Sequence, residues 1–355
     1  MRIGIPKEVK PLEGRVALIP PAVGEVVAQG HEVIVQAGAG LSSGYTNSDY
    51  TQAGARLVRD AAELYAEARM VLKVKEPVPA EYGLLRADHI VFSYLHLAAN
   101  PGLARALQET GLTAVAFETV EARGGLPLLA PMSDIAGRLA TQIGTTLLHS
   151  PQGGRGLLLG GLPAAERGKV VVLGAGTAGG NAAAVAAALG AEVTVFALSR
   201  QSLDRMHGLG ANVTALPSYA KLRARAVCEA DLLIGAVLIP GARAPHLVSA
   251  DLVRQMKPGS VIIDISVDQG GCIETIRPTD YTSPTYIEAG VVHFGVTNMP
   301  GAVPRSASQA LSAELVPYVL RLAGEVGLAD PVLATGINVA GGRIVHPAVA
   351  QALGA

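Results

Sequence analysis

The stretch Lys169-Val-Val-Val-Leu-Gly174-Ala-Gly176-Thr-Ala-Gly179 is the strongest indication of the fold of this chain. Its first half is a short apolar run typical of a buried strand, and an alanine-rich helical run over residues 181–189 and a second strand follow. In this setting Gly174 permits a tight turn, Gly176 lets the backbone approach a phosphate, and Gly179 lets the helix pack closely on the strand. The order predicts a dinucleotide-binding βαβ unit; a glycine-rich turn in an ordinary α/β sheet is the alternative.

The second strand of this unit departs from the dinucleotide pattern at its end. An acidic residue there usually receives the ribose hydroxyls of the cofactor. This strand ends Val195-Phe-Ala-Leu-Ser-Arg200, so Ala197 stands near that position and no carboxylate is present. Without the negative charge, Ser199 and Arg200 are candidates for binding a 2′-phosphate, whereas a solvated Arg200 is the alternative.

The rest of the chain repeats the alternation of strands and helices. Apolar runs lie at residues 2–5, 32–36, 70–75, 89–95 and 113–117, and again at 169–173, 192–196, 232–235, 261–265 and 291–295. Strands that are apolar on both sides are typical of parallel sheets covered by helices on each face. Helices are expected at 133–148 and at 307–324, the latter crossing back to the first domain.

The sequence therefore predicts an α/β protein of two doubly wound, Rossmann-like domains with a cleft between them. Residues 1–130 plus 305–355 are expected to form a substrate or catalytic domain, and residues 131–304 a dinucleotide-binding domain. A length of 355 residues suits two domains with substantial cores.

Composition excludes several classes of protein. The chain has 28 Lys and Arg against 29 Asp and Glu, a formal charge of −1, so it lacks the broad basic surface of a nucleic-acid-binding protein. Cys228 and Cys272 are too few for a disulfide framework, and no Cys/His cluster has the spacing of a metal site. Glu8 and Lys10 interrupt any apolar core of an export signal, so a reducing, cytoplasmic location is expected.

One stretch is long and apolar enough to suggest a membrane span. Residues 170–191 are almost uncharged, but they contain Asn181 and a glycine cluster in the middle. A strand, a turn and a buried helix explain this stretch better, so no membrane association is expected.

Polar side chains that end hydrophobic runs are candidates for a site, because ligands of open α/β sheets bind beyond the carboxyl ends of the strands. Lys75 and His96 each close such a run, Asp268 follows another, and Arg15 lies in an apolar segment. There are structural alternatives for each residue type. The lysine could be solvated, the histidine could be structural, and Asp264 or Asp268 could only cap a turn. No HExxH, GxSxG or Walker A sequence occurs, which disfavours hydrolases and nucleoside triphosphatases.

Eight motifs, in order along the chain, give a more specific indication. They are Gly4-Ile-Pro-Lys-Glu8, Arg15-Val-Ala-Leu18, Lys73-Val-Lys75-Glu-Pro77, Tyr94-Leu-His96, Pro131-Met-Ser133, Gly174 to Gly180, Asp268-Gln-Gly-Gly271 and Asn298-Met-Pro300. Together they resemble the alanine dehydrogenases from residue 3 to about residue 320, and the related nicotinamide transhydrogenase α subunits share several of them. Gly14 departs from the family's asparagine and Ala197 from its aspartate.

The resemblance implies reversible oxidative deamination of L-alanine to pyruvate and ammonia, with hydride transfer to NAD. It implies that Arg15 grips the substrate carboxylate and that Lys75 binds and polarises either the carboxylate or the carbonyl oxygen of the substrate. His96 would be the general acid and base, and Asp268 would position the attacking water or ammonia. NADP is possible as a cofactor because Ala197 replaces the aspartate.

The resemblance also assigns residues that line the site and suggests a homo-hexamer. Met132 and Asn298 would be walls of the substrate pocket, and the cofactor would contact Ser133, Gly174, Gly176, Gly179, Ala197, Ser199, Arg200, Ser218, Val237, Leu238 and Met299. Two alternatives stay open. One is a transhydrogenase-α-like protein that binds the cofactor without turning over alanine; the presence of Arg15, Lys75 and His96 argues against it. The other is a noncatalytic binding protein, which the replacement of the aspartate by Ala197 suggests.

Overall fold

The computed structural model describes residues 1–237 and 244–354, which form two α/β units. The first unit contains residues 1–132 and 301–355, and the second contains residues 133–300. Each unit has its own sheet, mostly parallel, with helices between successive strands. The predicted class, two doubly wound Rossmann-like units, is confirmed.

The sheet of the first unit has eight strands among the described residues. Their spatial order is β15 (Arg343–Ile344), β14 (Ile337–Ala340), β6 (Thr113–Ala116), β5 (Ile90–Ser93), β4 (Met70–Leu72), β1 (Arg2–Ile5), β2 (Glu32–Gln36) and β3 (Arg56–Val58). Strands β1 to β6 pair in parallel, whereas β14 and β15 add an antiparallel edge. The order reverses between β1 and β4, and this switch point is where open α/β sheets bind ligands.

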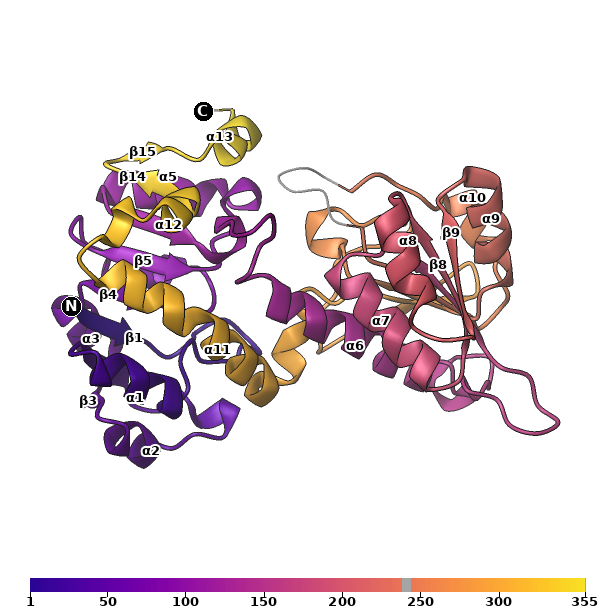
Figure 1. Cartoon of the computed structure of the whole chain (residues 1–355), viewed down its shortest axis with the longest axis horizontal. Coiled ribbons are helices and arrows are strands. Elements are labelled where there is room, and N and C mark those ends of the chain that lie inside the picture. The colour runs from indigo at the N-terminus through magenta and orange to yellow at the C-terminus, as the bar shows by residue number, and fades with distance from the viewer. Residues whose placement is uncertain (238–243, 355) are drawn as a thin grey trace. The chain divides into compact units, whose positions relative to one another are not determined.

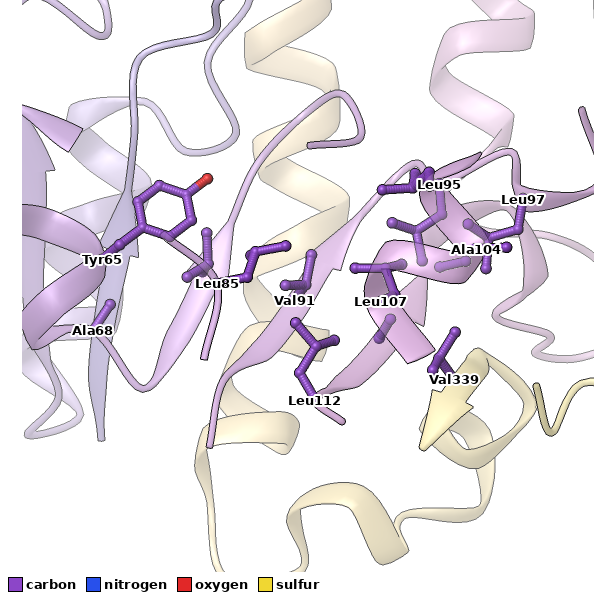
Figure 2. Close-up of a cluster of buried hydrophobic side chains, with 14 of the residues drawn as sticks. Tyr65, Ala68, Leu85, Val91, Leu95, Leu97, Ala104, Leu107, Leu112 and Val339 are labelled. Carbon is purple, nitrogen blue, oxygen red and sulfur yellow. The ribbon is translucent and has the colours of Figure 1, made fainter. Parts of the chain in front are cut away.

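Helices cover this sheet and close its core (Figure 1). They are α1 (Pro20–Ala28), α2 (Asn47–Gln52), α3 (Ala61–Glu67), α4 (Pro79–Tyr82), α5 (Pro101–Thr110), α11 (Pro304–Ala323), α12 (Pro331–Thr335) and α13 (Pro347–Leu353). Figure 2 shows one cluster of the core, where Leu107 and Leu112 meet Val91 of β5 and Val339 of β14. Each such buried side chain contributes roughly 1.5–3 kcal/mol of transfer free energy.

The second sheet has the strand order of dinucleotide-binding folds. It runs β12 (Thr285–Glu288), β13 (Val291–Phe294), β11 (Val261–Asp264), β10 (Leu232–Gly235), β7 (Lys169–Leu173), β8 (Glu192–Ala197) and β9 (Val213–Pro217). Counted from β7, the parallel strands lie in the order 3-2-1-4-5-6, with only β12 antiparallel among the described residues. Its helices are α6 (Ala130–Leu147), which begins in the first unit, α7 (Thr177–Ala188), α8 (Arg200–His207), α9 (Ala220–Glu229) and α10 (Ala250–Val253).

Short 3₁₀ turns follow several strands. They are η1 (Leu41–Ser43), η2 (Leu97–Ala99), η3 (Phe117–Thr119), η4 (Ser150–Gln152), η5 (Val267–Gln269), η6 (Met299–Ala302) and η7 (Gly327–Ala329).

Several predicted bounds are wrong. The strands expected at 70–75, 89–95 and 113–117 end earlier, at Leu72, Ser93 and Ala116, because the chain leaves the sheet there, for example into η3 directly after β6. The sequence did not predict strands β3, β9, β12, β14 and β15. Four of them are only two to four residues long, and β9 is a half-exposed edge strand that ends in a proline. These strands therefore lack the pattern of apolar residues on both faces that marks a buried strand. The helix expected at 181–189 begins at Thr177, directly after the glycine loop.

Residues 170–191, which raised the question of a membrane span, form most of β7, the glycine loop and α7. Across the described part of the chain, no helix is both long and apolar enough to cross a bilayer. The described residues also contain no group of three or more His, Cys, Asp or Glu side chains that could hold a metal ion.

Candidate active site

Arg15 lies beyond the carboxyl end of β1 and is only 2% exposed. Its Nε and Nη2 donate to the two carboxylate oxygens of Glu13, at 2.7 and 2.5 Å, and its Nη1 donates to Sδ of Met132 at 3.1 Å. Burial alone would lower the pKa of Arg15, but the hydrogen bonds and charge of Glu13 outweigh burial and raise it. The guanidinium therefore stays charged and is held in one plane by a two-pronged contact.

Two buried serines of α11 hold the segment that carries Arg15. The backbone N–H groups of Val16 and Ile19 donate to Oγ of Ser308 and Ser312, both at 2.9 Å. Helix α11 thus belongs to the first unit although it follows the second sheet in sequence.

Lys75 lies at the switch point between β1 and β4. Glu8, which follows β1, accepts the backbone N–H of Val74 at 2.7 Å and that of Lys75 at 3.4 Å. Burial raises the pKa of Glu8, and the nearby Lys73 ammonium opposes this. One buried carboxylate therefore fixes the backbone from which the half-buried side chain of Lys75 extends.

Lys73 and Lys75 differ in their surroundings. Lys73 is 1% exposed, and its Nζ lies 2.7 Å from Oε1 of Glu81 and 3.6 Å from Oε2 of Glu8. A buried ammonium with two carboxylates is a structural ion pair. The more exposed Lys75 is the better candidate for contact with a ligand.

His96 has an unusual backbone conformation. Its φ of 47° and ψ of 41° are left-handed, which costs a non-glycine residue on the order of 1–3 kcal/mol. The carboxylate of Glu118 stabilises this turn, because its Oε1 accepts the N–H of His96 at 2.6 Å and that of Leu95 at 3.2 Å. The same oxygen lies 3.9 Å from Nδ1 of His96, whose side chain is 43% exposed.

The neighbours of His96 anchor it to the core. Leu95 and Leu97 are buried in the cluster of Figure 2, so the backbone on both sides of His96 is fixed. The ring of Tyr94 stacks on that of His96 with centroids 5.9 Å apart, and its hydroxyl donates to the carbonyl of Leu128 at 2.5 Å. His96 is therefore an accessible imidazole on a rigid support.

The glycine loop has the geometry that its motif predicts. Gly174 has a φ of 103°, and a Cβ there would lie 2.4 Å from the carbonyl oxygen of Ala236. A Cβ on Gly179 would lie 1.9 Å from the carbonyl oxygen of Gly174, whereas a Cβ on Gly176 would meet nothing within 4 Å. Gly176 is also the N-cap residue of α7, and no side chain caps the helix there. The first backbone N–H groups of the helix therefore face open space. This cradle fits a pyrophosphate.

The end of β8 lies beside this loop. Ala197 is buried, and Ser199 caps α8 by accepting the N–H of Ser202 at 3.2 Å. Arg200 points into solvent, with its side chain 87% exposed and its Nε 2.9 Å from Oδ1 of Asp204. The solvated alternative for Arg200 therefore describes this structure.

Two further candidates for cofactor contact lie at strand ends of the second unit. The N–H of Ser218 donates to the carbonyl of Ala197 at 3.1 Å, and its Oγ accepts from Nη1 of Arg223 at 3.0 Å. Val237, which follows β10, donates its N–H to Oγ of Ser266 at 3.0 Å. Leu238 lies outside the described residues.

Asp264 and Asp268 have different environments. Asp264 is fully buried, and its carboxylate accepts the N–H groups of Ser266, Cys272 and Ile273 at 2.8, 2.7 and 3.2 Å. Burial raises its pKa, opposed by these hydrogen bonds. Asp264 is thus the turn-capping residue, whereas Asp268, on η5, is exposed.

The remaining candidates lie near the ends of the second unit. Met132 is buried against Arg15, and Ser133, the next residue of α6, is half-buried. Asn298 has a left-handed φ of 60°, and Met299 is buried, with its carbonyl accepting from the hydroxyl of Tyr281 at 2.9 Å.

Sequence reasoning missed the two carboxylates that position Arg15 and His96. Glu13 lies outside the hydrophobic runs that directed the search, although a carboxylate two residues before Arg15 could have suggested an ion pair. Glu118 lies 22 residues from His96, and only the pairing of β5 with β6 brings them together.

The strand order and the glycine loop define a protein of the Rossmann-like dinucleotide-binding class. Residues 4–136 match the model of the alanine dehydrogenase/PNT N-terminal domain, and residues 140–347 match that of its C-terminal domain. The chain belongs to the alanine dehydrogenase family.

Individual relatives agree with this assignment. An alanine dehydrogenase of Bacillus subtilis (strain 168) is 49% identical over 360 residues, covering 100% of this chain and 95% of the relative. The solved structure of an L-alanine dehydrogenase is 52% identical with a TM-score of 0.95, covering 100% of this chain and 99% of that one. A transhydrogenase from Sinorhizobium meliloti is 29% identical with a TM-score of 0.85, covering 98% of this chain and 100% of that one.

Proposed function

We propose that this chain is an enzyme that catalyses the reversible oxidative deamination of L-alanine to pyruvate and ammonia. The observation that carries the proposal is that Arg15, Lys75 and His96 all follow parallel strands of the first sheet, each fixed by a carboxylate. A guanidinium, an ammonium and an imidazole held in this way are the groups needed to bind an α-keto acid and move its protons.

The first unit would bind the substrate and the second the cofactor, with residues 1–130 plus 305–355 and 131–304 as the proposed domains. Gly174, Gly176 and Gly179 would hold the pyrophosphate of a nicotinamide dinucleotide. When bound, this cofactor supplies the acceptor for the hydride that leaves Cα of alanine.

Each polar residue has a separate task in this proposal. Arg15, its plane fixed by Glu13, would bind the substrate carboxylate, and Lys75 would polarise the oxygen that becomes the keto group. After Cα has been oxidised, water adds to the imine and ammonia leaves the carbinolamine. His96 would remove a proton from that water and return it to the departing nitrogen, while Asp268 would orient the water. Met132 and Asn298 would limit the space for the alanine methyl group.

The cofactor proposal includes NADP beside NAD. A carboxylate at the end of the second strand repels a 2′-phosphate, and Ala197 has none. The proposed cofactor contacts are Ser133, Ser199, Ser218, Val237, Leu238 and Met299. Arg200 is left out of this set, because its side chain is 87% exposed and paired with Asp204.

A homo-hexamer in the cytoplasm completes the proposal. The hexamer rests on the resemblance to the family. The location rests on the two free cysteines, since unpaired thiols such as buried Cys272 are typical of reducing compartments.

The experiment that tests the proposal is the reduction of NAD and NADP by L-alanine, followed at the nicotinamide absorbance band. Turnover with release of pyruvate is expected. A chain of the transhydrogenase-like alternative would bind the dinucleotide and show no alanine-dependent reduction.

Arg15→Lys is expected to raise the KM for pyruvate and alanine about tenfold or more. A lysine keeps the charge but loses the planar fork that faces Glu13 and a carboxylate ligand. Steady-state kinetics check this result, with Arg56→Lys as the control, because Arg56 is paired with Glu67 on the surface. An unchanged KM would remove Arg15 from substrate binding.

Glu118→Ala is expected to lower kcat roughly ten- to hundredfold, because unpaired backbone N–H groups cost about 1–3 kcal/mol and release the left-handed turn at His96. Glu118→Gln keeps an acceptor oxygen and should restore much of the activity. Dinucleotide affinity should stay near the wild-type value in both variants. Equal activity of the alanine and glutamine variants would contradict a positioning role for Glu118.

A further inference from the structure

The end of β8 is where the adenosine ribose of a dinucleotide lies in folds of this class. Strand β8 pairs with β7 so that Phe196 lies opposite Leu173, which places Ala197 beside the start of the glycine loop. Ala197 brings no charge, and the next side chain, Leu198, is 95% exposed. Nothing in this strand end would repel a phosphate on the ribose 2′-oxygen.

Arg205 reaches the same edge of the sheet from α8. Helix α8 packs along β8 and β9 (Figure 1), and Arg205 lies in its last turn. The Nη2 of Arg205 donates to the carbonyl oxygen of Ala175, the residue between Gly174 and Gly176. One edge of the guanidinium therefore lies against the glycine loop, while the residue as a whole stays exposed to solvent.

The charges of α8 distinguish Arg205 from Arg200. Arg200 donates through Nε to both carboxylate oxygens of Asp204, at 2.9 and 3.1 Å, so each neutralises the other. Arg205 has no carboxylate within 4.0 Å anywhere in the described part of the chain. Of the two arginines of α8, Arg205 is therefore the one without a carboxylate partner in the helix.

We infer that Arg205, and not Arg200, is the residue that binds the 2′-phosphate of NADP. The inference rests on the dinucleotide site proposed above and names the specificity-determining residue of that site. A 2′-phosphate on a ribose at the end of β8 meets a guanidinium already held at the adjacent loop, and it needs to displace only one neutral carbonyl acceptor. An arginine near this position is the general means by which such folds accommodate NADP.

The test compares two fragments of the cofactor, adenosine 2′,5′-bisphosphate and 5′-AMP, by isothermal titration calorimetry on the full chain. The ratio of their dissociation constants isolates the 2′-phosphate. The wild type is expected to bind the bisphosphate about ten- to hundredfold more tightly. Arg205→Ala should abolish this preference while leaving the affinity for 5′-AMP near the wild-type value, and Arg205→Lys should retain part of it.

Arg200→Ala is the matched control and should keep the preference, whereas Ala197→Asp should reduce it by charge repulsion. Loss of the preference in Arg200→Ala with retention in Arg205→Ala would overturn the inference, and so would equal affinities in the wild type. Equal affinities would leave the dinucleotide site standing. Failure of both fragments and of NADH to bind would instead reject the proposed site together with the inference.

Discussion

His96→Ala and Lys75→Ala are each expected to lower kcat about a hundredfold or more. Loss of a general acid and base typically costs 10²–10⁴-fold in rate, and loss of one electrostatic stabiliser of a developing charge costs about 10²–10³-fold. The structure supports a large effect because Glu118 and the buried Leu95 hold His96 in a strained turn, so no other side chain replaces it easily. Steady-state kinetics in both directions measure the loss.

The dissociation constant for NADH separates chemistry from cofactor binding in these variants. It should stay near the wild-type value, because both residues lie in the first unit and the glycine loop lies in the second. His31→Ala serves as the control, since Nδ1 of His31 forms a hydrogen bond with the N-terminal amino group at 3.2 Å and His31 has no proposed role in the site. Wild-type turnover in either variant, or a matching loss of NADH affinity, would contradict the assigned roles.

Gly179→Ala and Gly176→Ala are expected to damage the second unit in two different ways. In Gly179→Ala the new methyl carbon would lie 1.9 Å from a backbone oxygen, so β7 and α7 must separate. Overpacking of this kind costs about 1–3 kcal/mol, and 1 kcal/mol lowers the Tm of a domain of this size by roughly 2–4 °C. Affinity for the dinucleotide should fall with the melting temperature.

Gly176→Ala should leave the melting temperature nearly unchanged, because the methyl meets no protein atom within 4 Å and the φ of −71° suits alanine. It fills the space proposed for the pyrophosphate, so the dissociation constant for NADH should rise more than tenfold. Gly180→Ala is the control, since its methyl would face only the flexible end of Met206. Full affinity in Gly176→Ala would show that the cofactor binds elsewhere.

The glycine loop was predictable because its determinants are local. The positive φ of Gly174 is a property of one residue, and the contact between Gly179 and Gly174 joins residues five positions apart. The same holds for Lys75 and His96, whose placement at strand ends follows from where each hydrophobic run stops. The close approach of Ala236 to Gly174 is not local and was not predictable in this way. The edge strand β9 was not predictable in this way, since one of its faces contacts solvent and its sequence includes a proline.

Contacts between distant segments were beyond the sequence. Glu118 and His96 meet only because β5 pairs with β6, and α11 supports the Arg15 segment from nearly 300 residues away. The pairing of Arg200 with Asp204 is different, because an i,i+4 spacing on a helix is visible in the sequence and predicts an ion pair. The contact of Arg205 with Ala175 joins residues 30 positions apart and could not be predicted without the fold.

Oxidation of NADH and NADPH in the presence of pyruvate and ammonia is the decisive measurement for alanine dehydrogenase activity in this chain. We expect loss of absorbance at the nicotinamide band only when both substrates are present, with L-alanine as the product. The assay should span a pH of about 7 to 10, over which the fraction of free ammonia increases. No oxidation of either cofactor with both substrates over this range would contradict alanine dehydrogenase activity.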